Sequence, residues 1–531
     1  MLSPIHACLK VSRSFGKLPF EMWLWDTYFS TLLSAESSKE LAYANLIEIT
    51  RPTAMGNVPG YRTATDSVQD RSKPFVGAMV LEMLYGKFKD VWLVELLFDD
   101  MLIWANWIRD RRIEEPAGLV VLGSDNVAPG QSDGMQCTRT AVAWESGLDN
   151  SPLYDTSEVE WDYPARNPKT HRVPVPIGTS CRIHLYDAGM TGLYLSMLDS
   201  LSTLAGVLNR TSDATELRAR HTDMAGKLNT WLWNESMGIY ANVQSRGANR
   251  TSPRLSPFNF HPMITGAASV AQAQSMASKW LLTDNGFCLT DQSSTTETDD
   301  DERAMEVVGS CGGCNITHGM DAKQPAAQVA PEMYNVSPAA CCAACKANAG
   351  CETFVLGGNP NTAGVYPNCW LLANVTQSIT VRSGRALGCV KGVSPTPIPP
   401  PPPSPPPKPP SPIPCKYGVP SISHGDSAYT DQSYWRGRTW GPMNFLVWKG
   451  LAHPKYKDVA EVTEARKRLV VASRKLLLVE WLDHHHVHEN FNAATGRGCD
   501  VPNSNPFYHW GALLGVIGLM EDGHWATSGL P

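Results

Sequence analysis

The sequence lacks any long apolar run, although 43% of its 531 residues are hydrophobic. The longest nearly apolar stretch, from Leu513 to Met520, is far shorter than the roughly 18 residues that a membrane-spanning helix needs. The sequence also lacks an excess of basic residues: 45 Lys and Arg stand against 51 Asp and Glu, and the net charge is −6. A dispersed, slightly acidic charge disfavours nucleic acid as a partner. The composition therefore predicts globular domains with sizeable cores and no transmembrane segment.

The first residues lack the pattern of a signal peptide, because no charged segment leads from Met1 into an apolar run. The cysteines nevertheless indicate an oxidising compartment, since eight of the 14 fall between Cys311 and Cys389. Sequons for N-glycosylation add modest support, at Asn209, Asn234, Asn249, Asn315, Asn335 and Asn374. We therefore expect a protein of the secretory pathway, in the endoplasmic reticulum lumen or outside the cell, whose N-terminal targeting segment is missing from this sequence.

Amphipathic helices dominate the rest of the chain, and no run of alternating strands separates them. Residues 113–180 are irregular and rich in Gly, Pro, Asp and Asn, and loops that long inside a compact domain are usually functional. Paired helices with functional loops at one end indicate a barrel of helical hairpins, although periodicity alone leaves an irregular bundle open. The expected helices are 18–50, 75–86, 89–112, 183–209, 213–233, 265–283, 440–451, 456–483 and 506–521.

A segment of different composition interrupts the helices at 289–415. Its acidic, Ser/Thr-rich start, 289–310, is interpreted as a solvated linker rather than a calcium loop, because the required glycine and terminal glutamate are missing. The cysteine-rich part, 311–390, contains CCAAC at 341–345 and resembles the small, disulfide-rich α+β PAN/apple modules of extracellular proteins, which bind carbohydrate or protein ligands. A zinc site at Cys342 and Cys345 is the weaker alternative, because no second pair has matching spacing.

The insertion ends in 391–415, a nearly continuous run of proline that predicts a semi-rigid polyproline II spacer. An inserted domain must leave its host domain and return to it at neighbouring points. Cys288 and Cys415 stand at these two points, and we predict a disulfide between them. The host domain is accordingly expected to be discontinuous, over 11–288 and 416–525.

Two motifs with carboxylates stand out in the host domain. Residues 144–152, WESGLDNSP, place two acids four positions apart on a loop broken by glycine and proline. A second motif, HENFN at 488–492, lies far downstream. Two carboxyl groups on either side of a sugar are the minimum equipment for cleaving a glycosidic bond. We interpret Asp149 and Glu489 as that pair.

A longer series of motifs resembles glycoside hydrolase family 63, which holds processing α-glucosidase I and related bacterial and plant α-glycosidases. Outside the insertion, the similarity runs from about Val11 to Gly523. The motifs are Trp25-Asp26, Asp70-Arg71, Glu145 with Asp149, YWRGRTWGP at 434–442, Glu489-Asn490 and FYHWG at 507–511. The resemblance implies an (α/α)6 barrel and a mechanism that inverts the anomeric configuration.

The resemblance also implies that Asp149 is the general acid and Glu489 the general base. In an inverting glycosidase the acid protonates the leaving oxygen while the base activates a water molecule on the opposite face, with the two carboxyl groups about 6.5–9.5 Å apart. The acid must stay protonated near neutral pH, and we expect the negative charge of Glu145 in the same loop to favour this. A surface or capping role is the alternative for each lone acid.

Sugars stack their C–H faces on indole rings, while carboxylates and guanidinium groups bind their hydroxyls. Tryptophans equally form barrel cores, and Asp70 with Arg71 equally forms a structural ion pair. The expected substrate-binding residues are Trp25, Asp26, Asp70, Arg71, Trp144, Glu145, Tyr434, Trp435, Arg436, Trp440, His509 and Trp510. The run HHHVHE at 484–489 lacks the spacing of a zinc motif, so we expect neither a metal site nor a cofactor.

The sequence thus predicts an inverting exo-α-glycosidase that releases terminal α-glucose from oligosaccharides such as glucosylated N-glycans. Hydrolysis of a small solute such as mannosylglycerate or glucosylglycerate is an alternative, because branches of the family with that activity share these motifs. A non-catalytic carbohydrate-binding or wall-associated protein is a second alternative. It is disfavoured because both carboxylates and the surrounding tryptophans are present.

Overall fold

The chain divides into two compact units, one formed by Met1–Gln292 with Ile413–Pro531 and the other by Ser293–Pro412. The boundaries expected from the sequence lie within a few residues of these two divisions. The computed structural model describes residues 21–51, 55–63, 66–155, 158–162, 176–246, 250–289, 307–311, 314–318, 320–322, 327–357, 366–373, 378–380, 385–388 and 417–525.

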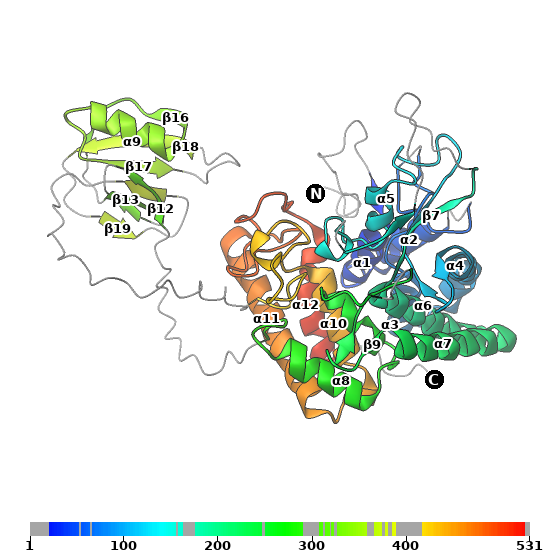
Figure 1. Ribbon diagram of the computed structural model, residues 1–531. Coiled ribbons are helices and arrows are strands. Elements are labelled where there is room, and N and C mark those ends of the chain that lie inside the picture. The colour runs from blue at the N-terminus through cyan, green and yellow to red at the C-terminus, as the bar shows by residue number, and fades with distance from the viewer. Residues whose placement is uncertain are drawn as a thin grey trace. The chain divides into compact units, whose positions relative to one another are not determined.

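The first unit is a two-layered ring of helices (Figure 1). Within the described residues, the inner layer consists of α1 (Leu24–Ser34), α3 (Gly77–Phe88), α6 (Ala188–Val207), the 3₁₀-helix η3 (Pro257–Met263), α10 (Gly441–Leu451) and α12 (Leu513–Glu521). Each of these contacts the next in this order, and α12 contacts α1, so the ring closes. Nearly all side chains of α1, α6 and α10 are buried, because neighbours cover these helices on every side.

The outer layer is built from helices that follow their inner partners along the chain. They are α2 (Lys39–Thr50), α4 (Val91–Arg112), α7 (Thr211–Trp231), α8 (Val270–Met276), which a π-helical turn at Ala277–Leu281 prolongs, and α11 (Ala460–His484). Helix α7 is typical, because it buries a single stripe at helical spacing: Ala214, Leu217, Met224 and Leu228. The predicted (α/α)6 barrel is confirmed.

Short antiparallel strands connect the helices, and several of them lie in the stretch 113–180, together with the one-and-a-half-turn helix α5 (Arg139–Trp144). The strands are β1 (Met22–Trp23), β2 (Tyr61–Arg62), β3 (Ile113–Glu114), β4 (Leu119–Val120), β5 (Gly123–Asp125), β6 (Trp161–Asp162), β7 (Ser180–Ile183), β8 (Leu185–Tyr186), β9 (Trp233–Asn234), β10 (Ile239–Tyr240) and β11 (Val243–Gln244). They explain why the expected helix 183–209 begins only at Ala188, where Asp187 accepts a hydrogen bond from the Met190 amide and caps α6.

A disulfide between Cys137 and Cys181 joins the loop after β5 to strand β7 and encloses the WESGLDNSP motif. Both cysteines are buried, and the sequence analysis did not assign this pair. Cys288 is also disulfide-bonded. Its expected partner, Cys415, lies outside the described residues, so that pairing stays a prediction.

Replacing both Cys137 and Cys181 by alanine is expected to lower the free energy of unfolding by about 2–4 kcal/mol, because the disulfide removes loop-closure entropy from the unfolded chain. Thermal unfolding without reductant measures the effect. Cys499→Ala is the matched control, since Cys499 is an exposed, unpaired cysteine and its loss should leave the midpoint unchanged. Equal midpoints for the double variant and the wild type would show that this disulfide does not stabilise the barrel.

Where the structure describes it, the second unit is an antiparallel sheet with one helix, α9 (Pro338–Ala347). The disulfides Cys341–Cys369 and Cys345–Cys351 bind α9 to the neighbouring sheet and loop, and Cys342 of the same helix is also disulfide-bonded. The sheet order is β12 (Val307–Cys311), β13 (Cys314–His318), β20 (Arg385–Gly388), β17 (Thr353–Gly357), β18 (Tyr366–Ala373) and β15 (Ala327–Gln328), and β16 (Met333–Val336) also pairs with β18. A separate two-stranded ladder joins β14 (Met320–Ala322) to β19 (Ser378–Thr380).

Two expectations for the insertion are corrected. The linker 289–310 does not extend to its predicted end, because β12 begins at Val307 and pairs with β13. The weaker zinc alternative is wrong for Cys342 and Cys345, because both are disulfide-bonded. The stretch considered for a calcium loop and the proline-rich segment lie outside the described residues.

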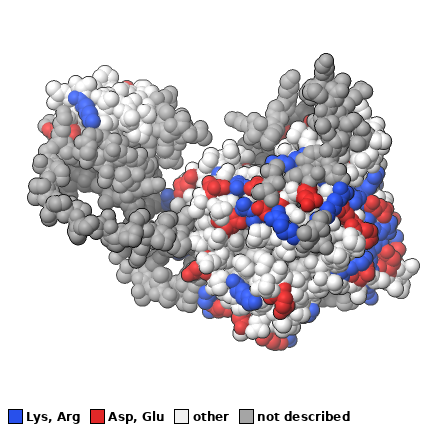
Figure 2. Space-filling view, viewed as in Figure 1, with Lys and Arg blue, Asp and Glu red and all other residues white. Residues whose placement is uncertain are grey.

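The surface of the barrel mixes charges of both signs. Figure 2 shows acidic and basic side chains interspersed over its visible face. No helix in the described part of the chain combines the length and apolarity needed to cross a bilayer.

Candidate active site

The ends of several inner helices meet around the two candidate carboxylates. Trp25 lies at the start of α1, Trp440 immediately precedes α10, and Trp510 lies in the 3₁₀ turn η7 (His509–Ala512) that leads into α12. The Trp25 ring centroid is 5.3 Å from that of Trp510 and 5.8 Å from that of Trp435. Helix N-termini carry partial positive charge, which favours carboxylates nearby.

Asp149 lies on the loop after α5, and its side chain is 36% exposed. The loop approaches α1 closely at Gly147, where φ is +76° and an added Cβ would stand 2.8 Å from the Trp25 ring. The Lys73 ammonium, itself 6% exposed, donates a hydrogen bond to Asp149 Oδ1 at 3.1 Å. Sequence reasoning missed Lys73, because a lone lysine ahead of a proline carries no signal of its own.

Glu145 does not take the place expected of it. It is fully buried and accepts hydrogen bonds from Arg112 Nε at 2.7 Å, the Gly123 amide at 2.6 Å and the Ser72 amide at 3.1 Å. Burial raises the pKa of Glu145, and the Arg112 guanidinium opposes the rise. Its carboxylate is therefore part of the barrel's polar core, and the charged group that contacts Asp149 is the Lys73 ammonium.

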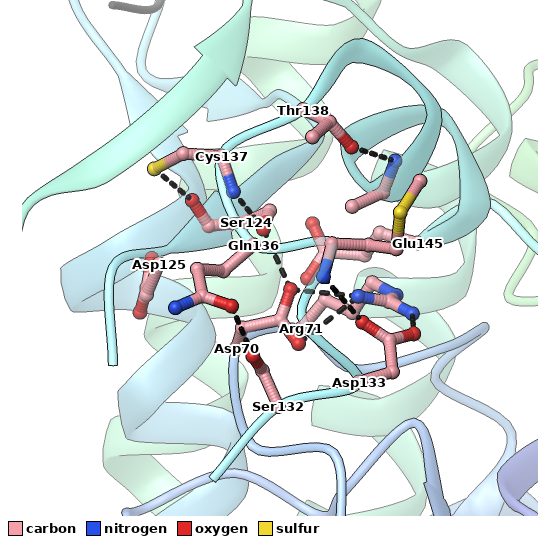
Figure 3. A network of polar contacts seen from close by, with 12 residues as sticks. Asp70, Arg71, Ser124, Asp125, Ser132, Asp133, Gln136, Cys137, Thr138 and Glu145 are labelled. Atoms are coloured by element: carbon pink, nitrogen blue, oxygen red, sulfur yellow. Dashed lines mark hydrogen bonds and ion pairs between the residues drawn. The ribbon is translucent and has the colours of Figure 1, made fainter. Parts of the chain in front are cut away.

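Asp70 and Arg71 form a buried ion pair (Figure 3). Arg71 Nη1 lies 2.7 Å from Asp70 Oδ2, and Arg71 Nη2 lies 2.5 Å from Asp133 Oδ2. Ser124 Oγ donates to Asp70 Oδ2 at 2.6 Å, and the guanidinium lies 5.3 Å from the ring centroid of Trp144. Burial raises the pKa of Asp70, while Arg71 counteracts it. These contacts agree with the alternative of a structural ion pair. Trp144, beside it, is partly exposed.

Glu489 follows α11 and is 3% exposed. Its Oε1 accepts a hydrogen bond from the Tyr434 hydroxyl at 3.0 Å, and Trp510 Nε1 donates to its backbone carbonyl at 2.7 Å. Burial raises the pKa of Tyr434 far above its usual value, and the carboxylates of Glu489 and then Asp149 add to the rise. Both candidate carboxylates therefore raise the pKa of this one hydroxyl, although they lie on opposite sides of the insertion in the sequence.

The expected sugar-binding tryptophans pack mainly on one another. Trp435 and Trp440 stack with ring centroids 3.6 Å apart, and Trp510 meets Trp440 edge-on at 5.7 Å. Trp25 and these three tryptophans are all buried. The barrel-core alternative accounts for most of their surface. The cluster also contacts both loops, because Gly147 lies against the Trp25 ring and Trp510 donates to the Glu489 carbonyl.

Asp26 is held by the segment that precedes α12. The Tyr508 hydroxyl donates to Asp26 Oδ1, and His509 Nε2 lies 2.8 Å from the Asp26 carbonyl oxygen. Burial raises the pKa of Tyr508, and Asp26 and Glu489 raise it further. Asp26 and His509 thus tie α1 to the start of α12 at the site.

Two arginines of the YWRGRTWGP motif also lie at the site. Arg436 forms ion pairs with Asp155 at 2.9 Å and with Asp431 at 2.7 Å, so its charge is already balanced within the protein. Arg438, which the sequence analysis did not single out, donates to Asn490 Oδ1 at 2.7 Å. Burial lowers the pKa of Arg438 to about 10, and the charge of neighbouring Glu489 opposes the decrease.

Histidines at the end of α11 and just after it contact other protein side chains. His488 Nδ1 lies 2.6 Å from Glu480 Oε2, and the imidazole ring of His486 stacks on Phe507 at 4.3 Å. Where the structure describes the chain, no group of three or more His, Cys, Asp or Glu residues is placed to hold a metal ion.

Two family models match this chain. A family model described as the mannosylglycerate hydrolase MGH1-like glycoside hydrolase domain matches residues 19–305 and 411–510, and a PAN domain model matches 325–372. No curated protein matches the chain.

Solved structures share the fold at low sequence identity. The GH63 mannosylglycerate hydrolase from Thermus thermophilus in complex with glucose is 16% identical, with a TM-score of 0.52, over 95% of this chain and 94% of its own. Its complex with Tris and D-glycerate gives 16% identity and a TM-score of 0.51, over 97% and 98%. Neutral trehalase from Saccharomyces cerevisiae is 11% identical, with a TM-score of 0.52, over 94% and 72%. Because the family model covers most of its length, this chain belongs to the mannosylglycerate hydrolase MGH1-like glycoside hydrolases of GH63, and it carries an inserted PAN domain.

Proposed function

We propose that this chain hydrolyses a terminal α-linked hexose from a small hydroxylated acid such as glycerate, with inversion at the anomeric carbon. Its family makes it an O-glycosyl hydrolase, whose substrate is a carbohydrate. The observation that carries the proposal is the hydrogen bond from the Tyr434 hydroxyl to Glu489, in a turn that Asn150, the residue after Asp149, also binds. The match to mannosylglycerate hydrolases favours a small leaving group such as glycerate.

Each carboxyl group is held by a contact of its own. Asp149 is partly exposed, and Lys73 occupies its Oδ1, which leaves Oδ2 for the glycosidic oxygen. In the reaction the Asp149 proton moves to that oxygen as its bond to the anomeric carbon breaks. Glu489 is buried and oriented by Tyr434, and it takes a proton from water as the water oxygen bonds to the anomeric carbon from the opposite face.

Release of glucose from glucosylated N-glycans is the second candidate. The disulfide between Cys137 and Cys181 within the barrel, with those of the inserted module, favours an oxidising compartment. A location in the secretory pathway, where such glycans occur, is therefore part of this proposal.

Proton NMR of the first sugar released tests both candidates. The substrates are α-mannosylglycerate, α-glucosylglycerate and a triglucosylated oligomannose glycan, and Glu489→Gln is the inactive control. We expect β-hexose from one of the two glycerates. β-Glucose from the glycan alone would support the second candidate instead. Release of an α-hexose, or no hydrolysis of any of the three by folded protein, would contradict the proposed reaction.

A further inference from the structure

The side chain of Asn150, directly after Asp149, connects the acid's loop to the segment that follows the insertion. Its Nδ2 donates a hydrogen bond to the Ser433 carbonyl at 3.0 Å, and its Oδ1 accepts one from the Trp435 amide at 2.8 Å. The side-chain amide of Asn150 thus bonds both peptide groups that flank Tyr434, one through its NH2 group and the other through its oxygen.

Tyr434 occupies an unusual position in this segment. Residues 433–436 form a tight turn, in which Ser433 and Arg436 exchange two backbone hydrogen bonds of 3.1 Å. Tyr434 is its first central residue, with φ at +57°, a left-handed conformation that turns ordinarily assign to glycine. A bulky residue keeps such a conformation only where its surroundings hold it. Over glycine the tyrosine adds a ring that meets Trp440 edge-on at 4.9 Å and the hydroxyl that binds Glu489.

These contacts form a continuous connection between the two carboxylates. Asp149 is bonded to Asn150, Asn150 holds the turn on both sides of Tyr434, and the Tyr434 hydroxyl holds Glu489. We propose that Asn150 is a positioning residue, which sets the separation of the general acid and the general base through Tyr434. This inference rests on the proposed function, in which that separation must accommodate both the sugar and one water molecule.

Loss of the Asn150 side chain should leave the turn folded, because other contacts remain. Trp440 Nε1 donates to the Tyr434 carbonyl at 3.2 Å, and Arg436 stays paired with Asp155 and Asp431. The turn would lose only its two hydrogen bonds to Asn150. The effect should therefore appear in the chemical step rather than in folding.

Kinetics of Asn150→Ala measure that effect. On whichever of the three test substrates the wild type hydrolyses, we expect kcat to fall roughly 10²-fold, as for a misplacement of about 1 Å. KM should change less than about threefold. Asn285→Ala, at an exposed position outside the site, is the matched control and should keep wild-type kinetics. Wild-type kcat in Asn150→Ala would overturn the proposal.

A double-mutant cycle separates positioning from a general structural effect. Tyr434→Phe removes the link to Glu489, so adding Asn150→Ala to it should cost less than about tenfold in kcat, far below its cost in the wild type. Fully additive losses would show that Asn150 does not act through Tyr434.

Hydrogen–deuterium exchange tests the connection without any substrate. In Asn150→Ala the Trp435 amide loses its acceptor, so peptides covering 433–436 should exchange faster than in the wild type and in Asn285→Ala. Unchanged exchange would show that Asn150 does not hold the turn at Tyr434. Faster exchange in a protein that hydrolyses none of the tested hexosides would locate the failure in the proposed function instead.

Discussion

Asp149→Asn is expected to lower kcat on an α-linked hexoside about 10³-fold, because the amide cannot protonate the leaving oxygen. The side chain keeps its size, and its Oδ1 can still accept a hydrogen bond from Lys73. Hydrolysis of the corresponding α-hexosyl fluoride should fall much less, since fluoride leaves with little help from an acid. The ratio of the two losses, measured by steady-state kinetics, is the signature of a general acid.

Two comparisons make this result specific to Asp149. Asp284→Asn changes an exposed aspartate outside the site and should leave both rates unchanged. Glu489→Gln should lower both rates together, because the base must activate water whatever group leaves. Equal losses on hexoside and fluoride for Asp149→Asn would contradict the assignment of the acid.

Arg112→Met is expected to destabilise the barrel by about 3–5 kcal/mol, a large part of the roughly 5–15 kcal/mol by which folded proteins are stable. The fully buried guanidinium lies 2.7 Å from Glu145 and 2.9 Å from Asp125, and it also donates to Ser180 Oγ at 2.9 Å. Methionine fills a similar volume but leaves Glu145 buried without its cation and Asp125 with only Arg111, at 4.0 Å. Thermal unfolding and soluble yield measure the loss.

The neighbouring arginine provides a matched control. Arg111 is 39% exposed and lies 4.0 Å from Asp125, so Arg111→Met should cost no more than about 1 kcal/mol. Arg112→Lys keeps the charge but not the planar guanidinium and should fall between the two. If Arg112→Met were no less stable than Arg111→Met, the buried network would contribute little to folding.

Glu145 illustrates how far sequence reasoning reached. Its place four residues before Asp149 predicts a negative charge beside the acid, but closeness in sequence does not bring the two carboxylates into contact. In the structure its partners come from three other segments, through Arg112, Gly123 and Ser72. Lys73 shows the converse, because its contact with Asp149 joins two loops that no local pattern relates.

The sequence by itself determined the features that depend on local spacing and composition. The helical layers follow from apolar periodicity, the insertion from its cysteine and proline content, and the family from motifs that are continuous in the chain. Only the tertiary structure decided which polar groups are buried together. In the folded chain Glu145 pairs with Arg112, the tryptophans pack on one another, and Asn150 is hydrogen-bonded to the turn at Tyr434. The physical reason is that the pairing of charges and hydrogen bonds depends on distances across the barrel, whereas helix formation depends mainly on residues within a few turns.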